Sequence, residues 1–163
     1  MPGRSARAAP AARPGFGCKA QVTGNDDGIV LDYSVEYGAA PDGPQLAPAI
    51  TRVARRAGQV PRAVTADRGY GHPFAERELH ELGVRIVAIP RQAATSPSRK
   101  TIEHGRGFRK LVKWRTGCEG RISYLKRGYG WDRTRLDRRQ GAAIWCGHGV
   151  FAHNLAKIAG LAT

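Results

Sequence analysis

A single carboxylate stands among basic residues in the segment 114–127, WRTGCEGRISYLKR. Arg115 lies four residues before Glu119, and Lys126 lies seven residues after it. Offsets of four and seven return to the same face of a helix, so a helix here would present one acid between two cations. A lone carboxylate on a basic surface suits chemistry in which a divalent metal ion is held against a phosphate backbone.

A second acid, Asp67, directly follows the short apolar segment 62–66, which is predicted to be a buried strand. In open α/β sheets, functional groups collect at the edge where the strands end. Asp67 could instead cap a helix, but the next helix is predicted to start only at Pro73. That distance favours a functional carboxylate. Two acids that converge from separate elements are the ligands that magnesium-dependent phosphoryl transfer requires.

The elements that must position these acids follow from turn signals and hydrophobic spacing. In chain order we expect a β-hairpin of 19–23 and 29–35 about the turn 25–28, a helix opened by 41–44 and ending at 57, a strand 62–66, a helix 73–82, a strand 84–89 parallel to the previous one, a mobile loop 91–110, a helix from 108 or 110 to 127, and a helix 142–159. The fold class is therefore α/β.

The faces of three helices are also predicted. In the first helix the apolar stripe is Leu46, Ile50, Val53 and Ala57, while the basic residues Arg52, Arg55 and Arg56 face solvent. In the last helix the buried stripe is Ile144, Phe151, Leu155 and Ile158. Gly117 and Gly120 inside the basic helix cost about 1 kcal/mol each relative to alanine, which indicates close backbone packing or the approach of a partner.

Composition limits the class of protein. The chain has 163 residues and a formal charge of +14, with 15 basic and 4 acidic residues between 91 and 139. We expect a basic disordered segment 1–15 followed by one domain, 16–163. A concentrated basic charge favours a nucleic-acid partner, although an arginine-rich solvated surface would look similar. No segment is apolar enough to cross a membrane.

The three cysteines also bear on metal binding and location. Cys18, Cys118 and Cys146 are far apart and odd in number, and form no C-x-x-C pair. They therefore indicate neither a disulfide framework nor a zinc ribbon, and a reduced, cytoplasmic setting follows, near the nucleoid if the partner is DNA. Cys146, His148 and His153 match no familiar zinc spacing and are interpreted as core or surface residues.

Taken together, these motifs resemble the DDE transposases of bacterial insertion sequences, in the group with a Y-R-E-K signature, Y-x2-R-x3-E-x6-K. Arg115, Glu119 and Lys126 stand at the signature's intervals, with Val112 at the tyrosine. The segment 66–71, ADRGYG, is similar to the family's segment with the second catalytic Asp. FGCKAQ at 16–21 resembles an F-G-Y-K strand start, and Asn154-Leu155 resembles an N-L pair near the end of the last helix.

The resemblance implies a ribonuclease-H-like fold, with a mixed sheet flanked by helices, and Mg²⁺- or Mn²⁺-dependent cleavage and strand transfer of double-stranded DNA. Asp67 and Glu119 would be the second and third catalytic, metal-binding carboxylates. Arg115 and Lys126 would contact DNA phosphates, and the neighbouring cations Arg121, Arg127 and Arg68 are further candidates. The active family form is implied to be a homo-oligomer.

One feature of the family pattern has no counterpart in the sequence. The family's first catalytic Asp lies on a strand upstream of the F-G-Y-K segment, and residues 1–15 contain no acid. Asp32 alternates out of phase with Leu31 and Tyr33, and the family pattern places no catalytic acid there. We therefore expect a truncated copy that lacks the first strand and is inactive alone. The alternatives are a non-catalytic basic DNA-binding protein and an inactive remnant.

Overall fold

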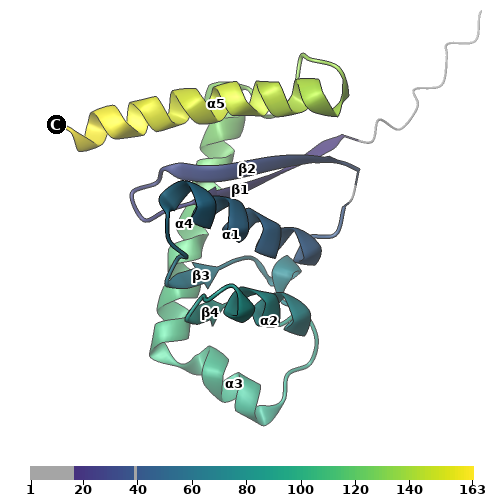
Figure 1. Cartoon of the computed structure of the whole chain (residues 1–163), viewed down its shortest axis with the longest axis vertical. Coiled ribbons are helices and arrows are strands. Elements are labelled where there is room, and N and C mark those ends of the chain that lie inside the picture. Colours follow the sequence, from purple (N-terminus) through teal and green to yellow (C-terminus); the bar gives the residue numbers. More distant parts are fainter. Residues whose placement is uncertain (1–16, 39) are drawn as a thin grey trace, which may run out of the picture.

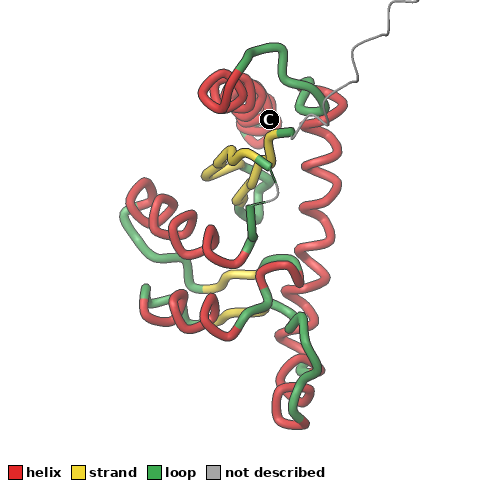
Figure 2. Tube along the Cα trace, turned by 90° about the vertical axis from the view of Figure 1, so that its right-hand side faces the viewer, coloured by secondary structure: helices red, strands yellow, loops and turns green. Residues whose placement is uncertain are grey.

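The computed structural model describes residues 17–38 and 40–163, with the side chains of 118 and 119 outside the description. The predicted disordered segment 1–15 lies outside the described residues. The described chain forms three layers, which Figure 2 shows edge-on: helices α1 and α2 on one side, the strands in the middle, and the long helix α4 on the other. A second long helix, α5, crosses the top and packs on β2 (Figure 1).

The predicted β-hairpin is confirmed. Strand β1 (Cys18–Gly24) pairs antiparallel with β2 (Val30–Tyr37). The Asn25 side chain accepts a hydrogen bond from the Ile29 amide at 2.9 Å. Gly28 takes a φ of 84°, which favours glycine. Turn chemistry in the sequence therefore determines this element.

The β-α-β unit is also confirmed. Strand β3 (Ala63–Thr65) is parallel to β4 (Ile86–Ala88), with a 3₁₀ helix η1 (Arg68–Tyr70) and helix α2 (Pro73–Glu81) between them. Helix α1 (Gly43–Ala57) ends at Gly58, whose φ is 70°. The apolar face of α1 packs against this unit in a core formed by Leu46, Ile50, Val64, Leu79, Val84, Val87 and Ile89.

Arg55 and Arg56 of α1 are exposed, as predicted, whereas Arg52 is half-buried. Arg52 and Arg56 nevertheless both reach the hairpin. Each binds Asp32 of β2: Arg52 donates to its Oδ2 at 2.7 Å, and Arg56 donates to its Oδ1 at 2.5 Å. Asp32 is only 2% exposed. A buried carboxylate requires charged or hydrogen-bonded partners, so the two arginines turn toward the strand. The predicted stripe residue Ala57, at the end of α1, is exposed.

The strands form two separate pairs among the described residues, β1–β2 and β3–β4, rather than the single mixed sheet that the resemblance implies. A cavity of about 360 Å³ lies between them. Thr23 and Gly24 line it from β1, and β3 lines it from the other side. Ile50, Val53, Leu111 and Trp114 line it from α1 and α4. This cavity separates the edge of β1 from the edge of β3.

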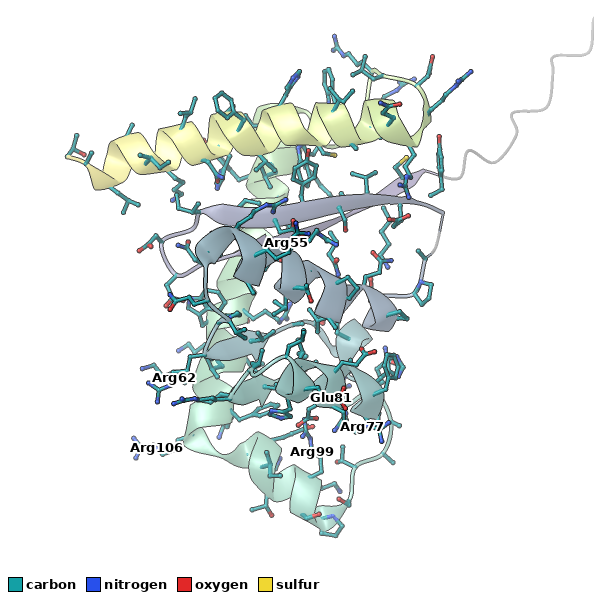
Figure 3. The ribbon with its side chains drawn as sticks, viewed as in Figure 1. Arg55, Arg62, Arg77, Glu81, Arg99 and Arg106 are labelled. Carbon is teal, nitrogen blue, oxygen red and sulfur yellow. The ribbon has the colours of Figure 1, made fainter. Side chains whose placement is uncertain are left out.

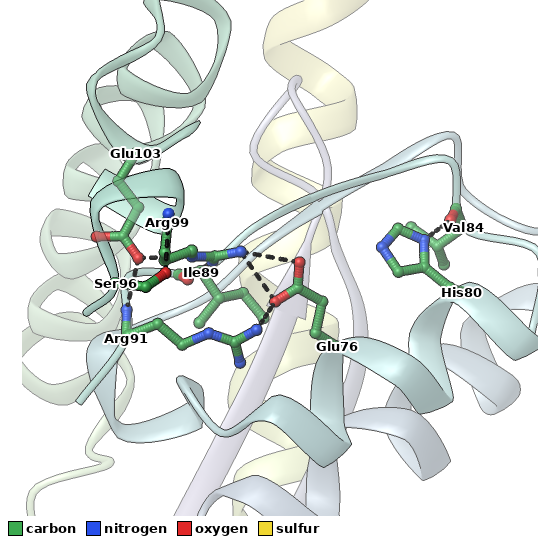
Figure 4. A network of polar contacts seen from close by, with 8 residues as sticks. All are labelled: Glu76, His80, Val84, Ile89, Arg91, Ser96, Arg99 and Glu103. Carbon is green, nitrogen blue, oxygen red and sulfur yellow. Dashed lines mark hydrogen bonds and ion pairs between the residues drawn. The ribbon is translucent and has the colours of Figure 1, made fainter. Parts of the chain in front are cut away.

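The segment 91–110 is not a mobile loop, as predicted, but contains helix α3 (Pro97–His104). Ser96 caps it by accepting a hydrogen bond from the Arg99 amide at 3.2 Å. Arg99 then binds Glu103 of α3, Glu76 of α2 and the Ile89 carbonyl (Figure 4). Burial lowers the pKa of Arg99, but its hydrogen bonds to Glu103 and Glu76 raise that pKa overall.

The last two helices are longer than predicted. Helix α4 spans Arg106–Tyr129 and α5 spans Arg138–Leu161. The predicted buried stripe of α5 is wrong, because Ile144, Phe151, Leu155 and Ile158 are 46–65% exposed. The face that packs on the hairpin consists of smaller or polar residues: Ala142, Cys146, Gly149, Val150 and His153.

Candidate active site and nucleic-acid interface

Asp67 stands at the carboxyl end of β3 and is exposed, as the sequence predicted. Its side chain also has the capping role that the sequence left as the alternative. Asp67 is the N-cap of η1, and its Oδ1 accepts a hydrogen bond from the Arg68 amide at 2.6 Å. The capping interpretation was set aside because α2 starts several residues later, but a short 3₁₀ helix intervenes. One carboxylate oxygen is thus engaged locally, and a carboxylate offers a second.

Two glycines allow the chain after Asp67 to pass close to neighbouring residues. A Cβ atom at Gly71 would lie 2.0 Å from the carbonyl oxygen of Pro90, so only glycine fits where η1 passes the end of β4. A Cβ atom at Gly69 would lie 2.8 Å from Asp42 Oδ2. The ADRGYG segment therefore brings its backbone against a neighbouring strand end and a second carboxylate.

Asp42, which the sequence indicates only as part of a chain break, lies close to the Asp67 segment. It forms an ion pair with Lys19 of β1 at 2.5 Å. Nearby, the Gln21 side chain donates a hydrogen bond to the Tyr70 hydroxyl at 2.7 Å. Burial, together with the Asp42 and Asp67 carboxylates, raises the pKa of Tyr70. Asp42 and Asp67 therefore both lie near Tyr70, a proximity that no spacing in the sequence could reveal.

Helix α4 supplies the second part of the predicted site. It is continuous through the segment that carries Arg115, Glu119 and Lys126, so these residues share one helical face. Helix α4 packs on both β3 and β4. The helix that bears Glu119 thus contacts the strand that leads to Asp67. The position of the Glu119 carboxylate lies outside the described side chains.

The five predicted DNA contacts do not all lie on that face. Arg121 follows Arg115 by six residues, which is about 240° around a helix. Its guanidinium lies 5.4 Å from the centre of the Trp114 ring. Lys126, Arg127 and Arg68 are exposed, whereas Arg115 is half-buried. The basic side chains of α4 therefore lie on several faces of the helix. A polyanion could contact them from more than one side.

The two glycines of α4 are not explained by close packing in the described part of the molecule. A Cβ atom at Gly117 or Gly120 would have nothing within 4 Å. Both glycines line an open cavity of about 610 Å³ between α4, α5 and the hairpin turn, together with Arg121, Tyr124 and Lys157. Of the two explanations offered by the sequence, the approach of a partner remains.

Asn154 has a structural role that the sequence resemblance did not supply. Its amide nitrogen donates to the Val30 carbonyl, and its amide oxygen accepts from the Val30 backbone N–H, both at 2.9 Å. His153 Nε2 lies 3.0 Å from the carbonyl oxygen of Gly28. The end of α5 is therefore tied to the backbone of the hairpin across more than 120 residues of sequence.

The donor atoms present indicate which kind of metal ion the described residues could bind. Among the residues with described side chains, which exclude Glu119, no three His, Cys, Asp or Glu residues are grouped to hold a metal ion. Asp67 offers carboxylate oxygen, the donor that Mg²⁺ prefers. Burial, aided by Cys18, raises the pKa of the Cys146 thiol to about 11. The donors available thus fit a magnesium-type ion in kind.

The described chain is thus an α/β protein in which the strand that leads to Asp67 packs against a basic helix that carries one acid. A family comparison agrees with that class: the transposase DDE domain family matches residues 3–155. The chain belongs to this family. No curated protein and no solved structure matches it. Within the described residues, none of the helices has the length and apolarity needed to span a membrane.

Proposed function

We propose that this protein acts in DNA transposition, by metal-dependent cleavage and transfer of DNA strands, as a transposase of a bacterial insertion sequence in the Y-R-E-K group. The family membership supports a DNA substrate. The observation that carries the proposal is the packing of α4 on β3, since α4 bears Glu119 and β3 leads to Asp67. Assembly of several copies and a place at the nucleoid complete the proposal.

In this proposal Asp67 and Glu119 bind Mg²⁺, or Mn²⁺ in its place. The ion would stabilise the attacking and leaving oxygens of an in-line displacement. Arg115 and Lys126, on the face of Glu119, would hold phosphates and neutralise their charge. Arg121, Arg127 and Arg68 would add DNA contacts farther from the reacting phosphate.

The space between β1 and β3 supports one further element of the proposal. Each of these strands pairs with one neighbour only among the described residues. Unpaired strand edges readily accept another strand, and the cavity between them runs beside β3. We propose that a strand with the first catalytic acid occupies this space in the active family form. Without that acid, the chain shown here would be inactive alone.

A second candidate function is a basic DNA-binding protein without metal chemistry. The capping hydrogen bond from the Arg68 amide to Asp67 favours it, because this bond gives the acid a structural task. In that case tight, salt-sensitive DNA binding would not depend on either acid. An inactive transposase remnant would bind neither the metal ion nor DNA selectively.

Isothermal titration with Mn²⁺ tests the metal site. The wild type is compared with Asp67→Asn, Glu119→Gln and, as a matched control, Glu81→Gln, an exposed acid of α2 (Figure 3). We expect the wild type and the control to bind Mn²⁺ equally, and each site variant to bind at least about tenfold more weakly, which corresponds to about 1.4 kcal/mol.

A parallel titration with a DNA duplex separates the candidates. Equal Mn²⁺ affinity in all four proteins, or no affinity in any, would contradict the metal site. If duplex binding then persists unchanged in the acid variants, the second candidate function is correct.

A further inference from the structure

Helices α4 and α5 cross beside the hairpin (Figure 1) and border the open cavity of about 610 Å³. This volume is within the range of about 300–1,000 Å³ that small-molecule sites occupy. Small residues of both helices line it: Gly117 and Gly120 of α4, Ala156 and Gly160 of α5. A Cβ atom at any of these three glycines would have nothing within 4 Å. The cavity therefore has room for a ligand, but it is too small for a DNA duplex, whose major groove alone is about 12 Å wide.

The cavity lies on the face of α4 opposite to the proposed metal ligand. Gly117, Arg121 and Tyr124 line it and follow one another at intervals of four and three residues, so they share one face of the helix. Glu119 lies about 200° around the helix from Gly117. Helix α4 thus offers two separate surfaces, and a ligand in the cavity does not need the metal site.

Two cationic side chains converge at the hairpin end of the cavity. Arg121 comes from α4 and Lys157 from α5, and both line it. A Cβ atom at Gly28 would lie 3.7 Å from Arg121 Nε and 3.6 Å from Lys157 Nζ. Two like charges beside one point repel each other, and a phosphate between them would remove that repulsion through charge-assisted hydrogen bonds. Asp27 of the turn also lines the cavity, but the two cations leave the described lining side chains with a net positive charge.

Tyr124 gives the cavity an aromatic wall. The residue is 52% exposed, and its ring contacts the rings of Tyr129 and His153 edge to face, with centroids 5.5 and 6.0 Å away. These two contacts position the ring and leave part of it open to the cavity. Nucleobases stack on exposed aromatic rings whatever their identity, since every base has a flat face. Tyr124 therefore supplies a surface on which a base can stack.

His153 adds a buried polar group that lacks a partner. It lines the same cavity and is only 1% exposed. Its Nε2 must carry the hydrogen, because Nε2 lies 3.0 Å from the Gly28 carbonyl oxygen, which only accepts. Its Nδ1 is then an acceptor in the neutral ring, and it has no hydrogen-bond partner among the described residues. Buried polar atoms nearly always have one, so a hydrogen-bond donor of a bound ligand is the partner that this site lacks.

We propose that the cavity between α4 and α5 is a binding site for a single nucleotide. The phosphate lies between Arg121 and Lys157, and the base stacks on Tyr124. A free nucleotide and the end of a DNA strand share this chemistry, and the experiment below distinguishes the two sources. The site is independent of the proposed metal chemistry. Failure of the Mn²⁺ titration would leave it intact, and its own failure would leave the metal site intact.

A chemical-shift titration of the nitrogen-15-labelled full chain with deoxyadenosine monophosphate, without metal, tests the site. We expect saturable binding with shifts at the cavity residues, and binding of inorganic phosphate alone at least about tenfold more weakly. Lys157→Gln removes one cation, and Gly117→Leu fills the cavity without changing the charge, where nothing lies within 4 Å of the Cβ position. Each variant should bind the nucleotide at least about tenfold more weakly. Lys100→Gln, which changes an exposed lysine of α3, is the matched control and should bind as the wild type does.

Circular dichroism must show equal helix content in all variants. The proposal is overturned if the wild type shows no saturable binding, if Gly117→Leu binds the nucleotide as well as the wild type, if inorganic phosphate binds equally well, or if Lys100→Gln loses as much affinity as Lys157→Gln. Competition by DNA identifies the source of the nucleotide. If a duplex with a one-nucleotide overhang displaces the nucleotide better than a blunt duplex does, the ligand is the end of a DNA strand. If the two duplexes compete equally or not at all, it is a free nucleotide.

Discussion

The contacts of Asp32 are not evident from its position in the sequence. Its pattern in β2 argues only that it is not catalytic. The structure gives the physical reason for its presence: both carboxylate oxygens bind arginines of α1, and the side chain is almost fully buried. Asp32 therefore fastens α1 to the hairpin. Asp67 shows the opposite case, an exposed acid with one capping hydrogen bond.

We predict that Asp32→Asn lowers the free energy of unfolding by about 1–3 kcal/mol. The loss should stay below that of a fully buried ion pair, because the Arg52 and Arg56 side chains are 37% and 59% exposed and can return to water. Urea unfolding measures the effect. Glu36→Gln, which removes an exposed ion pair with Arg139, is the control and should cost less than about 1 kcal/mol. Equal losses in the two variants would contradict the fastening role.

At the scale of elements, helices differ in how far their own sequence determines them. Helix α3 combines local signals that the prediction of a loop overlooked, the Ser96 cap and the Arg99–Glu103 pair, with distant ones, since Glu76 of α2 binds both Arg99 and Arg91. Within α3, the Arg99 hydrogen bond to Glu103 acts against burial and lowers the pKa of that acid. Helix α4 was recognised despite two glycines, since its length and flanking charges are local features.

The glycines of α4 give a prediction with two readouts. Gly117→Ala/Gly120→Ala should raise the free energy of unfolding by about 1 kcal/mol per site, because alanine favours the helix and nothing lies within 4 Å of either Cβ position. Affinity for a DNA duplex should fall if DNA approaches this face. Thermal unfolding and a duplex titration are the two measurements.

Gly149→Ala in α5 is the matched control for that pair. Its Cβ atom would lie 2.4 Å from Trp131 Nε1, so this variant should be destabilised by about 1–3 kcal/mol. A loss of stability in the α4 double variant would show that its glycine face is covered in the folded protein.

At the scale of the whole molecule, the basic charge is not uniformly available to a polyanion. Arg91 and Arg99 lie inside the 91–139 segment but bind Glu76 and Glu103. By contrast, Arg62 and Arg106 project outward in Figure 3. Net charge alone therefore overstates the number of phosphate contacts. The orientation of each basic side chain decides whether it can contact a phosphate.

Salt dependence measures how many cations take part. We predict that duplex affinity falls steeply with salt and that Lys126→Gln lowers the slope of log K against log[salt] by about 0.9, the value for one phosphate contact. Arg85→Gln is the control, because Arg85 is exposed but lies outside the basic segment. An equal change of slope in both variants would mean that DNA binds without preference for α4.

The sequence by itself determined the features that depend on neighbours along the chain. These are the hairpin turn, the end of α1, the parallel β-α-β unit and the family motifs. Tertiary structure alone decided which face of α5 is buried, because that burial depends on contacts between distant residues. Asn154 holds Val30, 124 residues away, and this docking turns the large apolar side chains of α5 outward. The same reason explains the separate strand pairs, since no local pattern reports whether two edges meet or leave a space.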